Sequence, residues 1–218
     1  MQTYKSVVFD FDSTLIRGES LDMLAAIALS GHHERAKILA DLEAITQQGM
    51  NGEISFDESL GRRLQLFKAN KEHVTRLVER LVHEISPSVQ RYCAWFLANR
   101  DRIYVVSGGF VDYIEPVASS LGIRADHVFA NRFIYDDSGI ITGFEPDSHL
   151  CRAGGKVSQL AALGLARPLV MIGDGYTDYE VKAHGEADAF WALTENVNRH
   201  TITAKADRVL EDFAEAVR

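Results

Sequence analysis

Short apolar runs rich in β-branched residues recur along the chain, and amphipathic helical patterns separate them. Residues 6–11 end in acids, residues 103–106 are followed by Ser-Gly-Gly, and residues 169–172 are followed by Gly-Asp-Gly. Residues 189–193 and 207–210 are weaker strand candidates. Strands that alternate with helices favour an α/β fold whose sheet is mostly parallel. The sequence therefore predicts a Rossmann-like core.

The intervening segments carry helical or hairpin signals. Two runs of alternating residues flank Asp-Asp-Ser-Gly and predict a β-hairpin at residues 133–135 and 140–142. The helical patterns lie at residues 89–99, 110–121, 157–163 and 178–184. These segments supply the connections that parallel strands need.

Residues 17–87 interrupt the alternation, because apolar residues there recur only at helical spacing. We therefore expect an α/β core formed by residues 1–16 and 88–218, with a helical cap domain of residues 17–87 inserted after the first strand. Hinges between the two are expected near residues 17–18 and 86–88. A cap that opens would admit substrate and exclude water when closed.

The composition narrows the class of protein. With 218 residues, of which 46% are hydrophobic and 25% charged, the chain is long enough to bury a core. The net charge of −8 argues against a nucleic-acid partner. The longest apolar stretches are too short to cross a bilayer, so no membrane partner is expected. Cys93 and Cys151 have no metal-binding spacing and fit reduced thiols, and we expect a cytoplasmic protein without a signal peptide.

Four aspartates follow the first and third predicted strands. The carboxyl ends of parallel strands meet at one edge of a sheet, where ligands bind. Asp10 and Asp12 share one side of an extended chain, and Asp174 and Asp178 share one face of a helix start. The first pair alone could equally be a turn or capping pair. All four together repel one another unless a cation is shared, which predicts a Mg²⁺ site.

The second strand and a later lysine add groups that bind anions. Ser107, Gly108 and Gly109 precede a predicted helix, whose free amides suit an anion, although a simple glycine turn fits as well. Lys156 follows two glycines that let the backbone approach a ligand. Phosphoryl transfer needs these groups together at one edge: a metal, carboxylates, amides and a lysine. The chain has no P-loop motif, which argues against a P-loop nucleotide enzyme.

Four motifs in order resemble the haloacid dehalogenase superfamily. These are DFDST at residues 10–14, Ser107, Lys156 and GDGYTD at residues 173–178. The stretches DFDSTLIRGESLDML, VSGGF and MNGEISFDESLGRRLQLFK are similar to the phosphoserine phosphatase family over nearly the whole chain. The resemblance implies a Rossmann-like core with an inserted helical cap and Mg²⁺-dependent phosphomonoester hydrolysis through a phosphoaspartate.

The resemblance also implies a role for each residue of the core motifs. Asp10 is the nucleophile, and Asp12 protonates the leaving alcohol and then deprotonates water. Mg²⁺ is held by Asp10, Asp12 through its backbone carbonyl, and Asp174, with Asp178 beside them. The phosphoryl oxygens are held by Ser107, Gly108, Gly109 and Lys156, and Thr177 belongs to the substrate site.

The resemblance assigns substrate selection to the cap. Glu19 pairs with the ammonium of a small phosphorylated amino acid, and Arg63 pairs with its carboxylate. Met50 and Phe56 close over the substrate. A planar guanidinium suits a carboxylate, whereas an unrelated arginine or first-turn acid would simply be solvated.

One departure and three alternatives remain open at this stage. Tyr176 stands where the family has a small residue, and its bulk would narrow the pocket. The activity could instead be hydrolysis of another phosphorylated amino alcohol, such as phosphohomoserine or phosphothreonine, or phosphoryl transfer to an alcohol. A catalytically silent phosphate-binding module is the third alternative. We expect a monomer or a homodimer.

Overall fold

A six-stranded parallel sheet forms the centre of the molecule. The computed structural model describes residues 3–50 and 53–217, with Gly49 and Met50 described in backbone only. The strand order is β3-β2-β1-β6-β7-β8. The strands are β1 (Ser6–Phe9), β2 (Ile103–Phe110), β3 (Val128–Asn131), β6 (Leu169–Gly173), β7 (Ala189–Leu193) and β8 (Arg208–Leu210). This topology confirms the predicted α/β fold.

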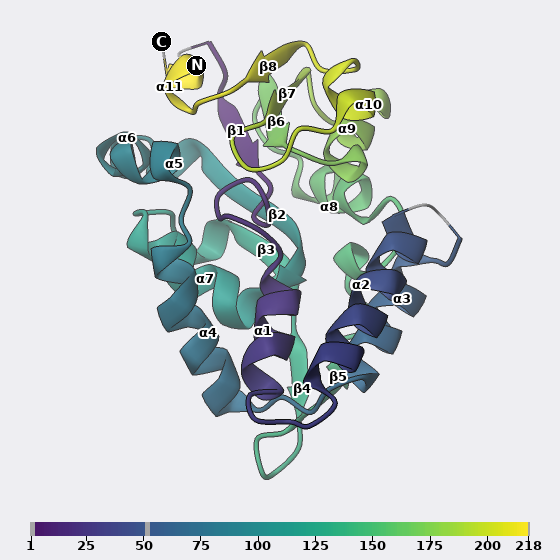
Figure 1. Ribbon diagram of the computed structural model, residues 1–218. Helices are drawn as coiled ribbons and strands as arrows, with labels where there is room; N and C mark the ends of the chain where they lie inside the picture. Colours follow the sequence, from purple (N-terminus) through teal and green to yellow (C-terminus); the bar gives the residue numbers. More distant parts are fainter. Residues whose placement is uncertain (1–2, 51–52, 218) are drawn as a thin grey trace.

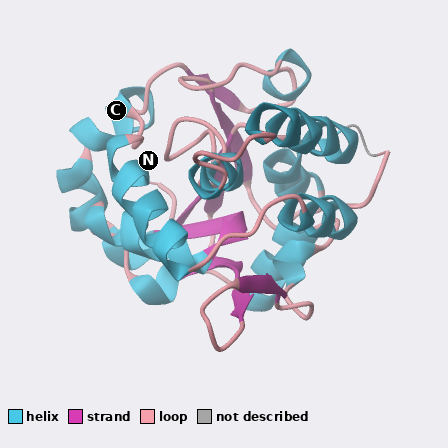
Figure 2. Cartoon of the chain, turned by 60° about the horizontal axis from the view of Figure 1, so that its bottom comes forward, coloured by secondary structure: helices cyan, strands magenta, loops and turns pink. Residues whose placement is uncertain are grey.

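Helices cover both faces of the sheet, because the strands are apolar on both sides. Along β1, Val7 and Phe9 belong to one hydrophobic cluster and Val8 to the other. Figure 2 shows the strands between helices on both sides. The first cluster is covered by α5 (Pro87–Arg91), α6 (Cys93–Ala98), α7 (Val111–Ser120) and α11 (Ala214–Val217). The second is covered by α8 (Gly155–Leu163), α9 (Tyr176–Ala183) and α10 (His200–Thr203) (Figure 1).

Four further helices lie between β1 and β2 in the sequence, at the end of the molecule where β1 stops (Figure 1). They are α1 (Ser20–Ala28), α2 (Arg35–Met50), α3 (Phe56–Gln65) and α4 (Lys71–His83). Helix α4 packs against α1 and α7, whereas α2 packs mainly against α3. Leu24, Leu77 and Leu81 belong to the same hydrophobic cluster as Phe9 of the sheet. The division into a core and a separate cap domain stays a prediction.

The predicted hairpin is present, with its second strand one residue later than expected. Strand β4 (Phe133–Tyr135) pairs antiparallel with β5 (Ile141–Phe144). Asp136 closes the turn, because its carboxylate accepts hydrogen bonds from the amides of Ser138 and Ile140. Short 3₁₀ turns at η1 (Arg100–Arg102), η2 (Ala125–His127) and η3 (His149–Cys151) complete the connections.

Two helix predictions were wrong at their boundaries. The helix predicted over residues 89–99 is broken at Tyr92, which ends α5 and begins α6 while its ring packs edge-on against Phe213. The helix predicted from Phe110 begins one residue later, because β2 continues to Phe110 and pairs there with Asn131. The side-chain amide nitrogen Nδ2 of Asn131 donates to the carbonyl of Gly108 at 2.9 Å and holds this irregular strand end.

Ser107, Gly108 and Gly109 therefore belong to the end of β2, and not to a helix N-terminus as predicted. The register of β2 against β3 shifts between Val106 and Phe110, which opens the ladder at these residues. Irregular strand ends of this kind leave backbone groups free near active sites. The three residues lie at the sheet edge as predicted, and the amide of Gly109 donates there to Oγ of Ser107.

Within residues 3–50 and 53–217, no helix has both the length and the apolar character needed to cross a bilayer. The two cysteines are free, Cys151 being buried and Cys93 partly exposed.

Candidate active site

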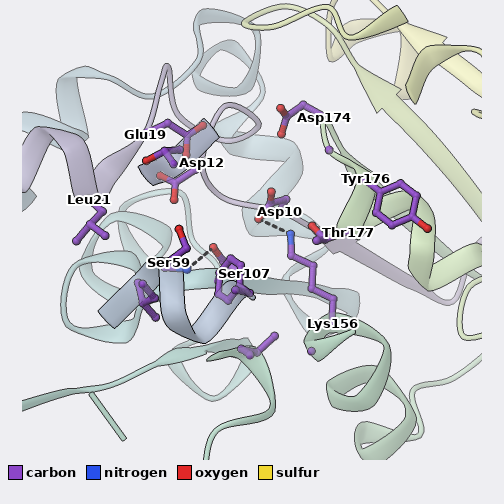
Figure 3. A pocket seen from close by; sticks show the side chains of 18 of the residues that line it. Asp10, Asp12, Glu19, Leu21, Ser59, Ser107, Lys156, Asp174, Tyr176 and Thr177 are labelled. Atoms are coloured by element: carbon purple, nitrogen blue, oxygen red, sulfur yellow. Dashed lines mark hydrogen bonds and ion pairs between the residues drawn. The ribbon is translucent and has the colours of Figure 1, made fainter. Parts of the chain in front are cut away.

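Three of the four acids predicted to meet at one sheet edge, Asp10, Asp174 and Asp178, lie together there. Asp10 follows β1 and Asp174 follows β6, its neighbour in the sheet. A cavity of about 570 Å³ opens at this edge and is lined by both residues. Figure 3 shows Lys156 reaching Asp10, with Asp174 and Thr177 close by. We call the part lined by Asp10, Ser107, Gly108, Gly109, Lys156, Asp174 and Thr177 the sheet end of the cavity; Asp178 is buried behind it.

Lys156 is held between two carboxylates. Its Nζ lies 2.8 Å from Oδ1 of Asp10 and 2.6 Å from Oδ1 of Asp178, and the side chain is only 7% exposed. Burial alone would lower the pKa of Lys156, but the charges of Asp10 and Asp178 outweigh it and raise the pKa. The lysine is therefore a fixed cation beside Asp10. Asp178 thus pairs directly with Lys156.

Asp178 fits its place because two neighbouring residues are glycines. A Cβ on Gly173 would lie 2.2 Å from the carboxyl group of Asp178. The amide of Gly175 donates to Oδ2 of Asp178 at 3.0 Å, at the start of α9. The Gly-Asp-Gly sequence thus gives a buried aspartate the space and one of the donors that it needs.

Asp10, Asp174 and Asp178 form a group that could hold a cation. One carboxylate oxygen from each lies within 4.8 Å of the others. Burial, followed by the charges of Asp10 and Asp178, raises the pKa of Asp174 to about 8. Arg199 compensates only in part, at 3.1 Å from Oδ2 of Asp174. An excess of buried carboxylate oxygens is the donor set that suits a hard divalent ion, so these residues fit Mg²⁺.

The side chain of Asp12 lies apart from this group. Its Oδ1 accepts from the amide of Ser20 at 2.8 Å, and its Oδ2 accepts from the hydroxyl of Ser20 at 3.0 Å. That hydroxyl lies 2.9 Å from the hydroxyl of Tyr113. Burial, then Glu19 and Asp10, raise the pKa of Asp12 well above its usual range. Burial and these neighbours therefore favour the protonated form of Asp12. Metal binding by its backbone carbonyl stays a prediction.

The end of β2 faces the same space. Oγ of Ser107 accepts from the amide of Gly109 at 3.1 Å, which leaves the hydroxyl hydrogen available to a ligand. Gly108 touches helix α3, since a Cβ there would lie 2.8 Å from Cζ of Phe56. The glycine thus allows the helices to approach the strand end closely.

The opposite part of the cavity, which we call the helical end, is formed by side chains of α1, α2 and α3. Glu19 and Arg63 both line it, as sequence reasoning predicted, and so does Phe56. Oε1 of Glu19 accepts from the hydroxyl of Ser13 at 2.9 Å. The remaining lining residues of these helices are Leu21, Thr46, Ser59 and Leu60. The side chain of Met50 lies outside the described residues.

Two buried polar atoms of α1 and α3 lack partners in the described part of the chain, one on Arg63, which lines the cavity, and one on Asp22, which lies outside its lining. Within the described residues, Nε of Arg63 and Oδ1 of Asp22 are buried and accept or donate no hydrogen bond. Nη1 of Arg63 donates to Thr46 over a long 3.4 Å. Burial raises the pKa of Asp22 to about 6, and Arg63 opposes the shift. Buried groups without partners are costly, so this end is built to receive a polar ligand.

Tyr176 lies at the outer rim of the cavity and is 54% exposed. Nζ of Lys205 lies 5.2 Å from the centre of its ring. Figure 3 shows the ring directed away from Asp10 and Lys156. The expectation that its bulk narrows the pocket stays a prediction.

Sequence reasoning missed several residues that hold the site. Ser20 donates to Asp12 and contacts the hydroxyl of Tyr113, and Thr14 donates to Oδ1 of Asp174 at 3.4 Å. Arg199 pairs with Asp174 from a distant loop. Ser20 lies next to Glu19 and could have been suspected as a partner of an acid. The sequence around Arg199 does not reveal this pairing, because its partner Asp174 follows β6 whereas Arg199 lies in the loop after β7.

Comparison with known proteins agrees with this geometry. Residues 7–181 match the family model of the haloacid dehalogenase-like hydrolases. The chain is 34% identical to the chloroplastic phosphoserine phosphatase of Arabidopsis thaliana, over 97% of this chain and 70% of the relative. It is 32% identical to phosphoserine phosphatase of Homo sapiens, over 96% of this chain and 90% of that protein.

The chain belongs to the phosphoserine phosphatase family of the haloacid dehalogenase-like hydrolases. Members of this family are phosphoric monoester hydrolases, and this protein is one of them. A solved structure described as a phospho-aspartyl intermediate analogue of phosphoserine phosphatase has a TM-score of 0.75 and 27% identity, and covers 99% of this chain and 98% of that one. The cytoplasmic location stays a prediction, since the Arabidopsis relative is named chloroplastic.

Proposed function

We propose that this phosphatase hydrolyses O-phospho-L-serine with Mg²⁺, through a phosphoaspartate on Asp10. The observation that carries the proposal is the position of Asp10. It lies 2.8 Å from a buried lysine and within the carboxylate group, at one end of a cavity whose other end holds Glu19 and Arg63. The similarity to phosphoserine phosphatases supports the choice of substrate.

In the first step, a carboxylate oxygen of Asp10 attacks phosphorus and the bond from phosphorus to the serine oxygen breaks. Asp12 gives its proton to that departing oxygen. The raised pKa of Asp12 favours the protonated form that this step needs. Lys156, the hydroxyl of Ser107 and the amides of Gly108 and Gly109 would hold the phosphoryl oxygens as charge moves onto them.

In the second step, Asp12 takes a proton from water, and the water oxygen attacks phosphorus of the phosphoaspartate. The bond from phosphorus to Asp10 breaks, which returns the free carboxylate and releases phosphate. Ser20 donates two hydrogen bonds to Asp12 and keeps the carboxylate in one position for both transfers. Covalent catalysis divides one difficult displacement into two easier ones.

Asp10, Asp174 and the backbone carbonyl of Asp12 would hold Mg²⁺, with Asp178 behind them. When bound, the ion would neutralise charge on the phosphoryl group and on the crowded acids. Thr14 and Arg199 orient Asp174, and the ammonium of Lys156 holds the carboxylates of Asp10 and Asp178 in place.

Substrate selection would lie at the helical end. The guanidinium of Arg63 has a buried Nε that lacks a partner and would donate to the substrate carboxylate. Glu19 would accept from the substrate ammonium while Ser13 holds its other face. Met50 and Phe56 would close over the carbon chain, and Thr177 would contact the phosphoryl group.

Release of inorganic phosphate from a panel of substrates tests the proposal. The panel contains O-phospho-L-serine, O-phospho-L-threonine, phosphohomoserine and p-nitrophenyl phosphate, each with Mg²⁺ and with a chelator. We expect the highest kcat/KM for phosphoserine and no turnover without metal. A preference for another member of the panel would overturn the substrate, and equal turnover with chelator would overturn the metal dependence.

A further inference from the structure

The chain passes twice between the sheet and the helices α1–α4. We call residues 13–17 the outgoing crossing and residues 84–88 the returning crossing. The two lie side by side, since the amide of Ser86 donates to the carbonyl of Leu15 at 2.9 Å. If the helices α1–α4 move relative to the sheet, the backbone of both crossings must change conformation.

Asn196, in the loop after β7, contacts both crossings. Its Nδ2 lies 2.7 Å from the hydroxyl oxygen of Ser86 in the returning crossing. The same nitrogen donates to the carbonyls of Ser13 and Ile16 in the outgoing crossing, each at 3.1 Å. A single side-chain amide thus ties together two segments about seventy positions apart in the sequence, and it does so from a third.

The outgoing crossing positions acids at both ends of the cavity. Ser13 has a φ of 53°, in the left-handed region that a serine adopts only when its surroundings hold it there. Its hydroxyl donates to Glu19 at the helical end, and the hydroxyl of the next residue, Thr14, donates to Asp174 at the sheet end. The carbonyl of Ser13 that Asn196 binds therefore belongs to the residue that orients Glu19.

Two neighbours of Asn196 strengthen this connection. The carboxylate of Glu195 accepts from the amide and the hydroxyl of Ser88 in the returning crossing. Arg199 pairs with Asp174. One loop after β7 therefore contacts the returning crossing, the outgoing crossing and an acid of the sheet end.

We propose that Asn196 is a positioning residue for substrate recognition. It holds the backbone of Ser13 in its left-handed conformation, so that the hydroxyl of Ser13 keeps Glu19 directed into the cavity. Asn196 lies outside the set that lines the cavity and acts through Ser13 and Glu19. The proposal rests on the proposed role of Glu19 in binding the substrate ammonium.

Steady-state kinetics of Asn196→Ala test the proposal, with Asn198→Ala as the matched control. Asn198 is an exposed asparagine two positions along the same loop. For Asn196→Ala we expect the KM for phosphoserine to rise about tenfold, the effect of losing one or two hydrogen bonds. The KM for p-nitrophenyl phosphate, which has no ammonium, should change less than about twofold. Equal changes on both substrates would overturn the proposal.

A double-mutant cycle with Glu19→Gln separates positioning from general loss of structure. If Asn196 acts through Glu19, Asn196→Ala should raise the KM for phosphoserine less than about twofold in the Glu19→Gln background. Additive effects would overturn the proposal. Should the alanine variant fail to fold, Asn196→Asp preserves the shape, removes the donors and predicts the same pattern.

Hydrogen exchange gives a readout that needs no substrate. The amide of Ser86 should exchange faster in Asn196→Ala than in Asn198→Ala, because the side chain that ties the crossings is gone. Unchanged exchange would overturn the proposal. Absence of phosphoserine turnover in the unaltered protein would instead overturn the proposed function, so the two failures are distinguishable.

Discussion

The two ends of the cavity differ in how completely their charges are paired. At the sheet end, Lys156 has two carboxylate partners within 2.8 Å, and Asp174 has Arg199 and Thr14. At the helical end, Nε of Arg63 is buried without a partner among the described residues. The charged groups of the sheet end are therefore paired within the protein, whereas Arg63 at the helical end keeps one buried donor that a ligand could bind.

Asp10→Asn breaks the sheet end most severely. The amide is a poor nucleophile, so we expect kcat for phosphoserine to fall at least about 10⁴-fold. The side chain keeps its size, so the fold should persist. Phosphate release and thermal unfolding measure the two effects.

The exposed Asp101 provides the control, and Asp101→Asn should leave kcat unchanged, since its carboxylate only pairs with Arg124 at the surface. Retained turnover in Asp10→Asn would contradict the assignment of the nucleophile.

Arg63→Ala tests the helical end alone. Loss of the guanidinium should lower kcat/KM for phosphoserine about 100-fold, while the value for p-nitrophenyl phosphate changes less than about threefold. The matched control is Arg62→Ala, because Arg62 is half exposed and pairs with Glu58 at 2.6 Å. If kcat/KM falls equally for both substrates, Arg63 does not bind the substrate carboxylate.

The sheet end should also respond to pH when metal is absent. The pKa of Asp174, about 8 in the folded protein, exceeds its ordinary value of 3.8. The folded state therefore keeps a proton that the unfolded state releases, and this group lowers stability as pH rises from about 4 to 8. Mg²⁺ must displace that proton, so its apparent affinity should rise about tenfold per pH unit towards pH 8.

Calorimetric titration with Mg²⁺ between pH 6 and 8, together with the melting temperature of the metal-free protein, measures this linkage. In Asp174→Asn the fall in metal-free stability over this range should become smaller, because Asp12, whose pKa is also raised, still contributes to it. A Mg²⁺ affinity that does not change with pH would show that Asp174 gives up no proton to the ion.

Gly108→Ala changes the contact between the end of β2 and helix α3. The new Cβ would meet the ring of Phe56 at 2.8 Å, so helix α3 or the ring must shift. We expect KM for phosphoserine to rise about threefold to tenfold with kcat nearly unchanged, as the helical end moves away from β2. Gly61→Ala in α3 is the control, since a Cβ there meets no atom within 4 Å.

A second substitution tests whether the rise in KM of Gly108→Ala comes from the contact with Phe56. Phe56→Leu combined with Gly108→Ala relieves the clash, and KM should return towards that of Phe56→Leu alone. A KM for Gly108→Ala that equals that of the unaltered protein would show that the contact does not set the distance between the two ends.

Much of the sheet end could be predicted from the sequence, because its residues directly follow strands. Asp10 and Asp174 stand at strand ends, and parallel strands bring such ends to one edge. Lys156 follows a pair of glycines at a helix start. The prediction was wrong about Ser107–Gly109, since the pairing of β2 with β3 extends the strand and no local pattern reveals that shift of register.

The helical end could be predicted only through resemblance. Glu19 and Arg63 alone look like ordinary helix charges, and the family motif singled them out. Asp22 carried no such signal, because what distinguishes it is a buried oxygen without a partner. Burial of a side chain depends on which helices cover it, and spacing along one helix does not contain that information.

The sequence by itself determined the parallel α/β fold, the insertion point of the helices and the acids at the sheet edge. These three features follow from the local periodicity of apolar residues and from the residues that directly follow each strand. Only the tertiary structure decided which distant residues hold the site, such as Arg199 beside Asp174 and Asn196 between the two crossings. Those contacts join segments far apart in the chain, and their energies arise only once the whole molecule has folded.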